Sequence, residues 1–178
     1  MNFKISKRVF YSALNTVSRA ISSNSPLPAL SGIKIEVNQD SIVLTGSDSD
    51  ISIQTTLKGS DEEINLIVKE TGSIVIEAKY ILEIVRKIDA DEIELEIVDG
   101  SLTKISGMSA EFRINGMRAL DYPAIDFTRP GQQFEMDADV LLKVISQTTF
   151  ATSDRETRPV LTGVNMKCSG KRLECVAT

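Results

Sequence analysis

The chain contains no histidine among its 178 residues, which narrows the chemistry its side chains can perform. Serine or cysteine nucleophiles paired with histidine, histidine metal sites and imidazole acid–base catalysis are all excluded. Carboxylates remain, and Asp48 and Asp50 flank one serine at a spacing that could suggest a metal site. No further ligands cluster near them in the sequence. We therefore interpret both as turn residues and expect neither a metal nor a cofactor.

Basic side chains are the other group that could bind a ligand, and they are unevenly distributed. The net charge of −5 and the isoelectric point near 4.9 disfavour a phosphate-rich partner. Between Met1 and Ile35, however, five basic residues and no acidic residue give +5, which leaves −10 for the remainder. The sequence thus predicts a molecule with one basic and one acidic side.

Composition limits the class of protein. Hydrophobic residues make up 42% and charged residues 25%, as in ordinary globular proteins. The absence of tryptophan and an aromatic content of 5% argue against stacking platforms for single-stranded nucleic acid. The N-terminus lacks the apolar region of a signal peptide and no apolar run is long enough for a membrane span. We expect a cytoplasmic protein that does not enter membranes.

Hydrophobic periodicity predicts the elements that position these residues. Residues 3–5 alternate as a short strand, residues 9–21 recur at helical spacing, and three alternating runs follow between 33 and 53. The same βαβββ order begins again at residue 74, at a constant shift of 71 that places Val9 on Tyr80. We predict an α+β domain over 1–127 made of two βαβββ units. Its helices should lie on one face of antiparallel sheets and bury a stripe that includes Tyr80 and Ile84.

A second repeat begins near Gln132, at a shift of 131 without a gap. It places the segment Pro28-Ala-Leu-Ser-Gly32 on Pro159-Val-Leu-Thr-Gly163, after a proline-punctuated linker. Residues 128–178 should therefore begin a second, incomplete domain that stops partway through its unit. The same shift places Cys168 and Cys175 on apolar strand positions, so we expect both to be buried free thiols.

Several stretches, in this order, resemble the bacterial DNA polymerase III beta subunit family, the sliding clamps. They are MNFKI, LPALSGIKIEV followed by LTGSD, FRINGMRALDYP, and ETRPVLTGV followed by VAT. The resemblance implies the DNA clamp fold, in which two head-to-tail chains form a ring, with helices around duplex DNA and sheets outside. It also implies a non-catalytic processivity factor whose partners are double-stranded DNA, the DNA polymerase III alpha subunit and the clamp loader.

The resemblance also implies roles for particular residues. Asn24 stands where the family often has an arginine, so we expect that loop to bind DNA more weakly. Phe112 and Ile114 lie on a predicted last strand that would pair with the other subunit. Leu161 and Thr178 would form part of a pocket for partner peptides. The positions expected to face DNA are Arg8, Asn15, Arg19, Asn24, Lys79, Arg86, Lys143, Arg155 and Arg158.

Two other functions remain open from the residues alone. One is a small α+β hydrolase that uses a carboxylate-bound metal, which would need a metal near Asp48 and Asp50. The other is a protein-interaction module that does not hold DNA. Retention on circular DNA separates this module from a clamp.

Overall fold

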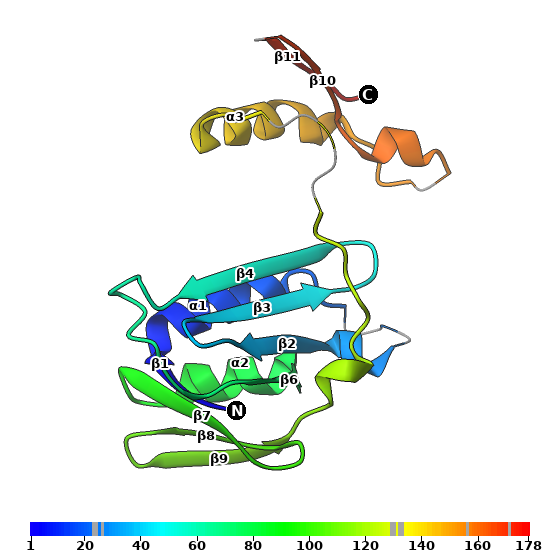
Figure 1. Ribbon diagram of the computed structural model, residues 1–178. Helices are drawn as coiled ribbons and strands as arrows, with labels where there is room; N and C mark the ends of the chain where they lie inside the picture. The colour runs from blue at the N-terminus through cyan, green and yellow to red at the C-terminus, as the bar shows by residue number, and fades with distance from the viewer. Residues whose placement is uncertain (23–24, 26, 129–130, 132–133, 156, 171) are drawn as a thin grey trace. The chain divides into compact units, whose positions relative to one another are not determined.

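The computed structural model describes residues 1–178 except 23–24, 26, 129–130, 132–133, 156 and 171 (Figure 1). The chain divides into two compact units, Met1–Asp126 and Phe127–Thr178. The elements of the first unit are β1 (Asn2–Ser6), α1 (Lys7–Ser18), η1 (Pro28–Ser31), β2 (Gly32–Val37), β3 (Ser41–Ser47), β4 (Ser52–Lys58), β5 (Ile67–Glu70), β6 (Gly72–Glu77), α2 (Ala78–Lys87), β7 (Glu92–Asp99), β8 (Leu102–Gly107), β9 (Ala110–Asn115) and η2 (Ala119–Asp121).

The nine strands form two antiparallel sheets, ordered β5-β1-β7-β8-β9 and β4-β3-β2-β6. Each predicted repeat contributes its first strand to the sheet of the other repeat. β1 pairs with β7, where Phe3 lies opposite Leu95, and β6 pairs with β2, where Ile76 lies opposite Ile33. The two repeats are therefore interlocked, and neither can complete a sheet without the other.

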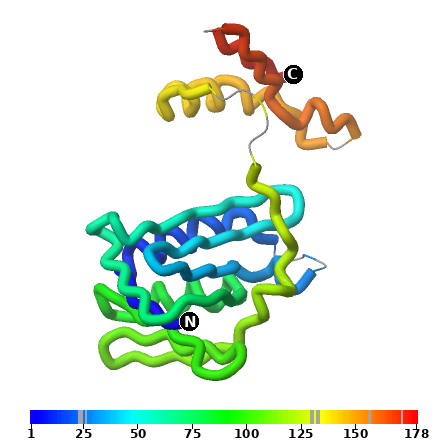
Figure 2. Tube along the Cα trace, in the orientation of Figure 1, coloured from blue at the N-terminus to red at the C-terminus, as the bar shows by residue number. Residues whose placement is uncertain are grey.

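The two helices of this unit lie side by side and pack on the inner faces of the sheets (Figures 1 and 2). From α1, Phe10, Leu14 and Val17 are fully buried, and from α2, Ile81 and Val85 are fully buried. They join one apolar cluster with inward side chains of both sheets. The predicted α+β class, with the helices on one face of antiparallel sheets, is confirmed.

Two details of the first unit differ from the prediction. Tyr80 is half exposed, because the buried side of α2 is centred on Ile81 and Val85 and leaves the ring at its rim. The Lys79 ammonium lies 5.7 Å from the centre of the Tyr80 ring. Strand β5 was not predicted, because its exposed residues carry no period-two apolar pattern.

Gly46, in the LTGSD stretch, lets α1 pass very close to β3. A Cβ atom at this position would lie 2.3 Å from the carbonyl oxygen of Val17, near the end of the helix. Backbone atoms cannot move aside as a flexible side chain can, so any larger residue would push α1 away from the sheet. The glycine therefore sets the distance between helix and sheet.

Tyr122 anchors the segment that follows β9. Its side chain is buried in a small apolar cluster with Ala29, Leu30 and Val75. Its hydroxyl donates to the carbonyl oxygen of Thr45 at 3.5 Å, and burial raises its pKa to about 12. Tyr122 therefore makes the stability of the unit sensitive to alkaline pH.

The second unit consists of α3 (Ala138–Thr148), η3 (Thr149–Ala151), η4 (Pro159–Thr162), β10 (Asn165–Ser169) and β11 (Arg172–Val176). The segment that begins at Pro159 has the same hydrogen-bonded turn as the segment that begins at Pro28 in the first unit. The Thr162 hydroxyl donates to the Pro159 carbonyl at 2.8 Å, as the Ser31 hydroxyl donates to that of Pro28 at 2.7 Å. The repeat at a shift of 131 is thus visible in the hydrogen bonds. None of the described helices in either unit is long and apolar enough to cross a membrane.

The expectation that both cysteines are buried is wrong. Cys168 is exposed and Cys175 is half-buried. β10 and β11 form a two-stranded sheet, whereas the corresponding strands of the first unit belong to a four-stranded sheet. Residues 134–137, which match β1, form no strand, since the described part of the second unit has no counterpart of β5 or β7. Strand position alone therefore does not bury a side chain here.

Candidate functional site

The exposed sides of α1 and α2 form one polar surface, which we call the helix face. It carries five basic side chains and one acidic side chain. Arg8, Asn15 and Arg19 are exposed on or directly after α1, opposite its buried apolar stripe. The helix face consists of Arg8, Ser12, Asn15, Thr16, Arg19, Lys79, Tyr80, Glu83, Arg86 and Lys87.

Three of the five basic residues on the helix face are held by carboxylates. The Arg86 guanidinium donates to both oxygens of Glu83, at 2.8 and 2.9 Å, and the Lys87 ammonium lies 3.2 Å from the same carboxylate. Arg8 donates to Glu63 at 2.8 Å. The hydrogen bonds from Arg86 and then Lys87 lower the pKa of Glu83, so this group is ionised at neutral pH.

The other two basic residues of the helix face have no such partner in the part of the chain that the structure describes. Arg19 follows the end of α1, and Lys79 lies in the first turn of α2. Among the ion pairs of the described residues, none involves Arg19 or Lys79. Both charges are therefore available to an anionic ligand.

A hollow of about 640 Å³ lies beside the beginning of α1 and the end of α2. Arg8 and Arg86 both line it, together with Tyr11 and the exposed Met108, neither of which the sequence had suggested as functional. Tyr11 could have been found from its position one helical turn after Arg8. The remaining lining residues are Ser6, Lys7, Asp89, Ala90 and Asp91, so acidic and basic groups nearly balance in the hollow.

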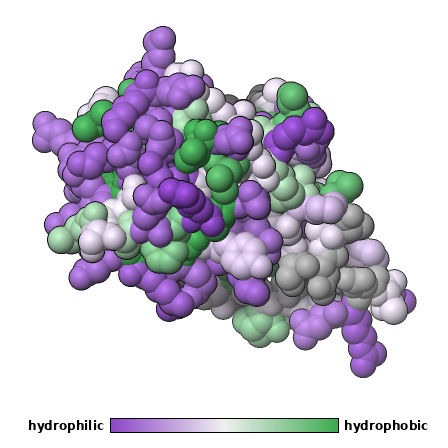
Figure 3. Space-filling model, turned by 90° about the horizontal axis from the view of Figure 1, so that it is seen from below, coloured by the Kyte–Doolittle hydropathy of each residue, from purple (hydrophilic) through white to green (hydrophobic). Residues whose placement is uncertain are grey.

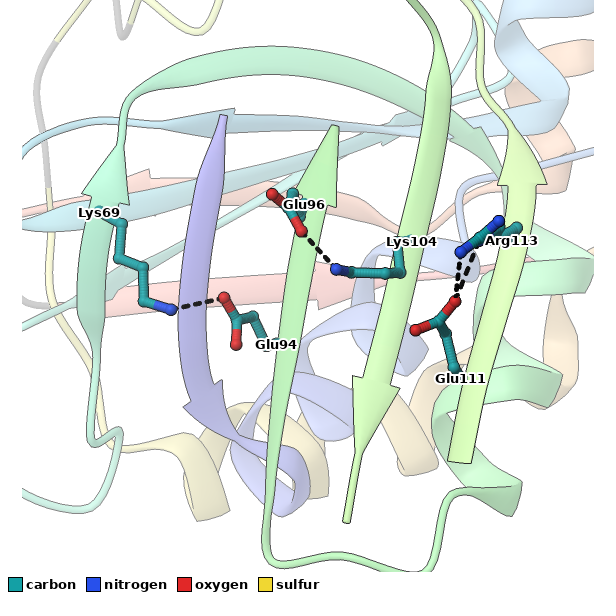
Figure 4. Close-up of polar contacts among 6 residues, drawn as sticks. All are labelled: Lys69, Glu94, Glu96, Lys104, Glu111 and Arg113. Carbon is teal, nitrogen blue, oxygen red and sulfur yellow. Dashed lines mark hydrogen bonds and ion pairs between the residues drawn. The ribbon is translucent and has the colours of Figure 1, made fainter. Parts of the chain in front are cut away.

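The outer face of the five-stranded sheet carries matched charges. Figure 4 shows three pairs on this sheet face, two between strands, from Lys69 to Glu94 at 2.6 Å and from Lys104 to Glu96 at 2.6 Å, and one within β9, from Arg113 to Glu111 at 2.8 Å. The hydrogen bond from Lys69 is the main cause that lowers the pKa of Glu94. Hydrophilic residues likewise cover most of the surface seen in Figure 3. Three acidic residues outside the N-terminal segment, Glu94, Glu96 and Glu111, are therefore paired on this sheet.

The remaining predicted DNA-facing residues lie elsewhere. Lys143 is exposed on α3, and Arg155 and Arg158 are exposed in the loop before η4. A hydrogen bond from the Ser153 amide to the Leu161 carbonyl, at 2.9 Å, closes this loop. These residues belong to the second unit, whereas Arg8, Asn15, Arg19, Lys79 and Arg86 share the helix face of the first. Asn24 lies outside the described residues.

The residues suggested for protein contacts are accessible to different degrees. Phe112 is 38% exposed and Ile114 is half-buried on β9, an edge strand that, among the described strands, pairs with β8 alone. Its free backbone groups could accept another strand. Leu161 is half-buried and Thr178 is exposed.

Asp48 organises a turn, as the sequence analysis proposed. Its carboxylate accepts hydrogen bonds from the backbone amides of Ile51 at 2.8 Å and Asp50 at 3.0 Å, and these lower its pKa. The described residues contain no group of three potential metal ligands. The contacts therefore give the metal-hydrolase alternative no support.

Comparison with known proteins identifies relatives over the whole length of the chain. Residues 1–126 match the DNA polymerase III beta subunit, N-terminal domain, and residues 135–178 match its central domain. The beta sliding clamps of Halalkalibacterium halodurans and Bacillus subtilis are 42% and 39% identical to this chain, which they cover completely. The chain spans 47% of each, or about half of the relatives' length.

Solved structures give the same result. The DNA polymerase III beta chain of Streptococcus pneumoniae superposes with a TM-score of 0.95 at 32% identity, over 99% of this chain and 47% of that one. The DNA polymerase sliding clamp of Bacillus subtilis superposes with a TM-score of 0.94 at 39% identity, over 100% and 47%. The predicted DNA clamp fold is therefore confirmed.

Proposed function

Because this chain belongs to the DNA polymerase III beta subunit family, we propose that it supplies one part of a ring that encircles duplex DNA and tethers the replicative polymerase. It acts without catalysis, as a processivity factor within a polymerase holoenzyme in the cytoplasm. Its further partners are the polymerase alpha subunit and the clamp loader. The family relationship gives the hydrolase alternative no support.

The observation that carries this proposal is the helix face. Two packed helices present five basic side chains on one surface, and three of these are already engaged by carboxylates. Each phosphate that a protein neutralises adds a salt-sensitive attraction that resists sliding. A surface with few available charges attracts the duplex without holding it in one place. This is the property that a sliding ring requires.

We expect substitution of Arg19 and Lys79, the unpaired basic residues of the helix face, to weaken duplex binding by this chain. The double variant Arg19→Gln/Lys79→Gln should bind a labelled 30-base-pair duplex about 10-fold more weakly at low salt. The slope of log K against log salt should decrease by about 1.8, because two phosphate contacts are lost. Fluorescence anisotropy over a salt series measures both quantities, and wild-type binding should vanish at physiological salt.

The matched control is Lys104→Gln/Arg113→Gln, which removes two positive charges from the sheet instead. It gives the same net charge as the test variant and should change affinity less than about 2-fold. Equal weakening by both double variants would show that the helix face is not the surface that meets DNA.

A protein can encircle the duplex only as a closed ring. We propose that the edge strand β9, with Phe112 and Ile114, joins another subunit by main-chain hydrogen bonds in a head-to-tail homodimer. A chimera of this chain with the remaining part of the Bacillus subtilis clamp provides a test. It should stay on a nicked circular plasmid after loading and slide off once the plasmid is linearised. Equal retention on both DNA forms would favour ordinary binding.

We expect this chain alone to show no measurable heat of binding with a clamp-binding peptide. Leu161 and Thr178 would supply only part of the proposed pocket, and an apolar anchor gains affinity only in a closed site. Isothermal titration calorimetry should detect binding by the chimera and about a 10-fold loss in its Leu161→Ala variant. Micromolar binding by the 178-residue chain would place the pocket elsewhere.

A further inference from the structure

We propose that Glu83 limits the attraction of the helix face for duplex DNA and is thus a residue that tunes sliding. It is the one acidic residue on that face and has two of the five basic residues as partners. This inference rests on the proposed function, because it assumes that the helix face meets DNA.

The contacts of Glu83 place it where it can compete with a phosphate. Arg86 and Lys87 follow it by three and four positions, so the three side chains lie on one side of α2. Both carboxylate oxygens accept from Arg86, and the second also faces Lys87. All three side chains are about half exposed or more. A duplex that approaches this surface therefore meets a carboxylate between two cations.

The effect on DNA follows from charge. A phosphate that reaches Arg86 or Lys87 must take the place of the Glu83 carboxylate or accept its repulsion at short range. Fewer counterions are then released from the duplex for the same number of basic side chains. Glu63 lies outside the helix face and competes with a phosphate for Arg8 in the same way.

A purely structural role for Glu83 makes a different prediction. Pairs at three and four positions along a helix stabilise that helix modestly. If this were its whole role, substitution would lower the stability of the unit and leave duplex affinity unchanged. Affinity and stability must therefore be measured on the same variants.

The test compares Glu83→Gln with Glu111→Gln in the full 178-residue chain. Both glutamates are 48% exposed, both pair with an arginine at 2.8 Å, and both substitutions change the net charge by the same amount. At low salt, Glu83→Gln should bind the labelled duplex about 3–10-fold more tightly and steepen the salt slope by about 1–2. Glu111→Gln lies on the sheet and should change affinity less than about 1.5-fold.

Equal effects of the two substitutions, or no gain with Glu83→Gln, would overturn the inference. Circular dichroism and a urea midpoint establish that each variant is folded. Glu63→Gln, which releases Arg8, provides a second test and should tighten binding about 2–3-fold.

The double variant Arg86→Gln/Lys87→Gln separates this inference from the proposed function. If it weakens binding while Glu83→Gln does not strengthen binding, the inference alone fails. If neither this variant nor Arg19→Gln/Lys79→Gln weakens binding, the helix face does not meet DNA and both proposals fail.

Discussion

Replacing Phe10 with alanine is expected to lower the free energy of unfolding of the Met1–Asp126 unit by about 3–5 kcal/mol. The Phe10 ring is fully buried and packs in a T-shaped arrangement with the Phe3 ring at a centroid distance of 5.7 Å. Phe3 lies on β1, which pairs with β7 of the second repeat. The substitution therefore leaves a cavity where the helix of one repeat meets the sheet of the other. Urea unfolding followed by circular dichroism measures the loss.

Phe112→Ala is the matched control for this prediction. The same atoms are removed, but Phe112 is 38% exposed on the edge strand β9, so we expect a loss of about 1 kcal/mol. Similar losses for the two variants would mean that the contact between α1 and β1 does not carry the stability of the unit.

Raising the pH from 9 to 12 should lower the stability of the first unit by about 2.3 kcal/mol through Tyr122 alone. Burial raises its folded-state pKa to about 12, whereas an exposed tyrosine titrates near pH 10. The unfolded chain therefore loses this proton first. The stabilisation by neutral Tyr122 is complete below pH 10 and is lost as the pH rises through 12, at about 1.36 kcal/mol for each pKa unit.

Comparison with Tyr122→Phe isolates this contribution. All other ionisable groups are the same in both proteins, so their contributions cancel in the comparison. The stability of the wild-type protein relative to Tyr122→Phe, measured from urea midpoints, should fall as the pH rises from 9 to 12, because phenylalanine cannot ionise and keeps the cluster with Leu30 and Val75 neutral. Parallel pH profiles for the two proteins would show that Tyr122 ionises without cost in the folded state.

The sequence predicted the local elements well because their signals lie within a few residues of one another. The periods of α1 and α2 were correct. Tyr80 was assigned to the buried stripe of α2 but is half exposed. A shift of one residue along the helix separates the buried stripe from its edge. The turn role of Asp48 was also correct, because its partners are only two and three residues away.

The candidate site was only partly predictable. Four of the five basic residues of the helix face, Arg8, Arg19, Lys79 and Arg86, were among the positions expected to face DNA. The pairing of Arg8 with Glu63 joins residues 55 positions apart, so no local pattern contains it. The hollow with Tyr11 and Met108 likewise combines segments distant in sequence.

The amino-acid sequence by itself determined the repeated units, their helices and strands, and the family to which the chain belongs. Only the tertiary structure decided that β1 and β6 exchange sheets, because strand partners depend on backbone hydrogen bonds between distant segments. It also decided burial. Val37 is buried and its repeat counterpart Cys168 is exposed, although both occupy equivalent strand positions. Burial depends on the layers packed around a strand, and these come from elsewhere in the chain.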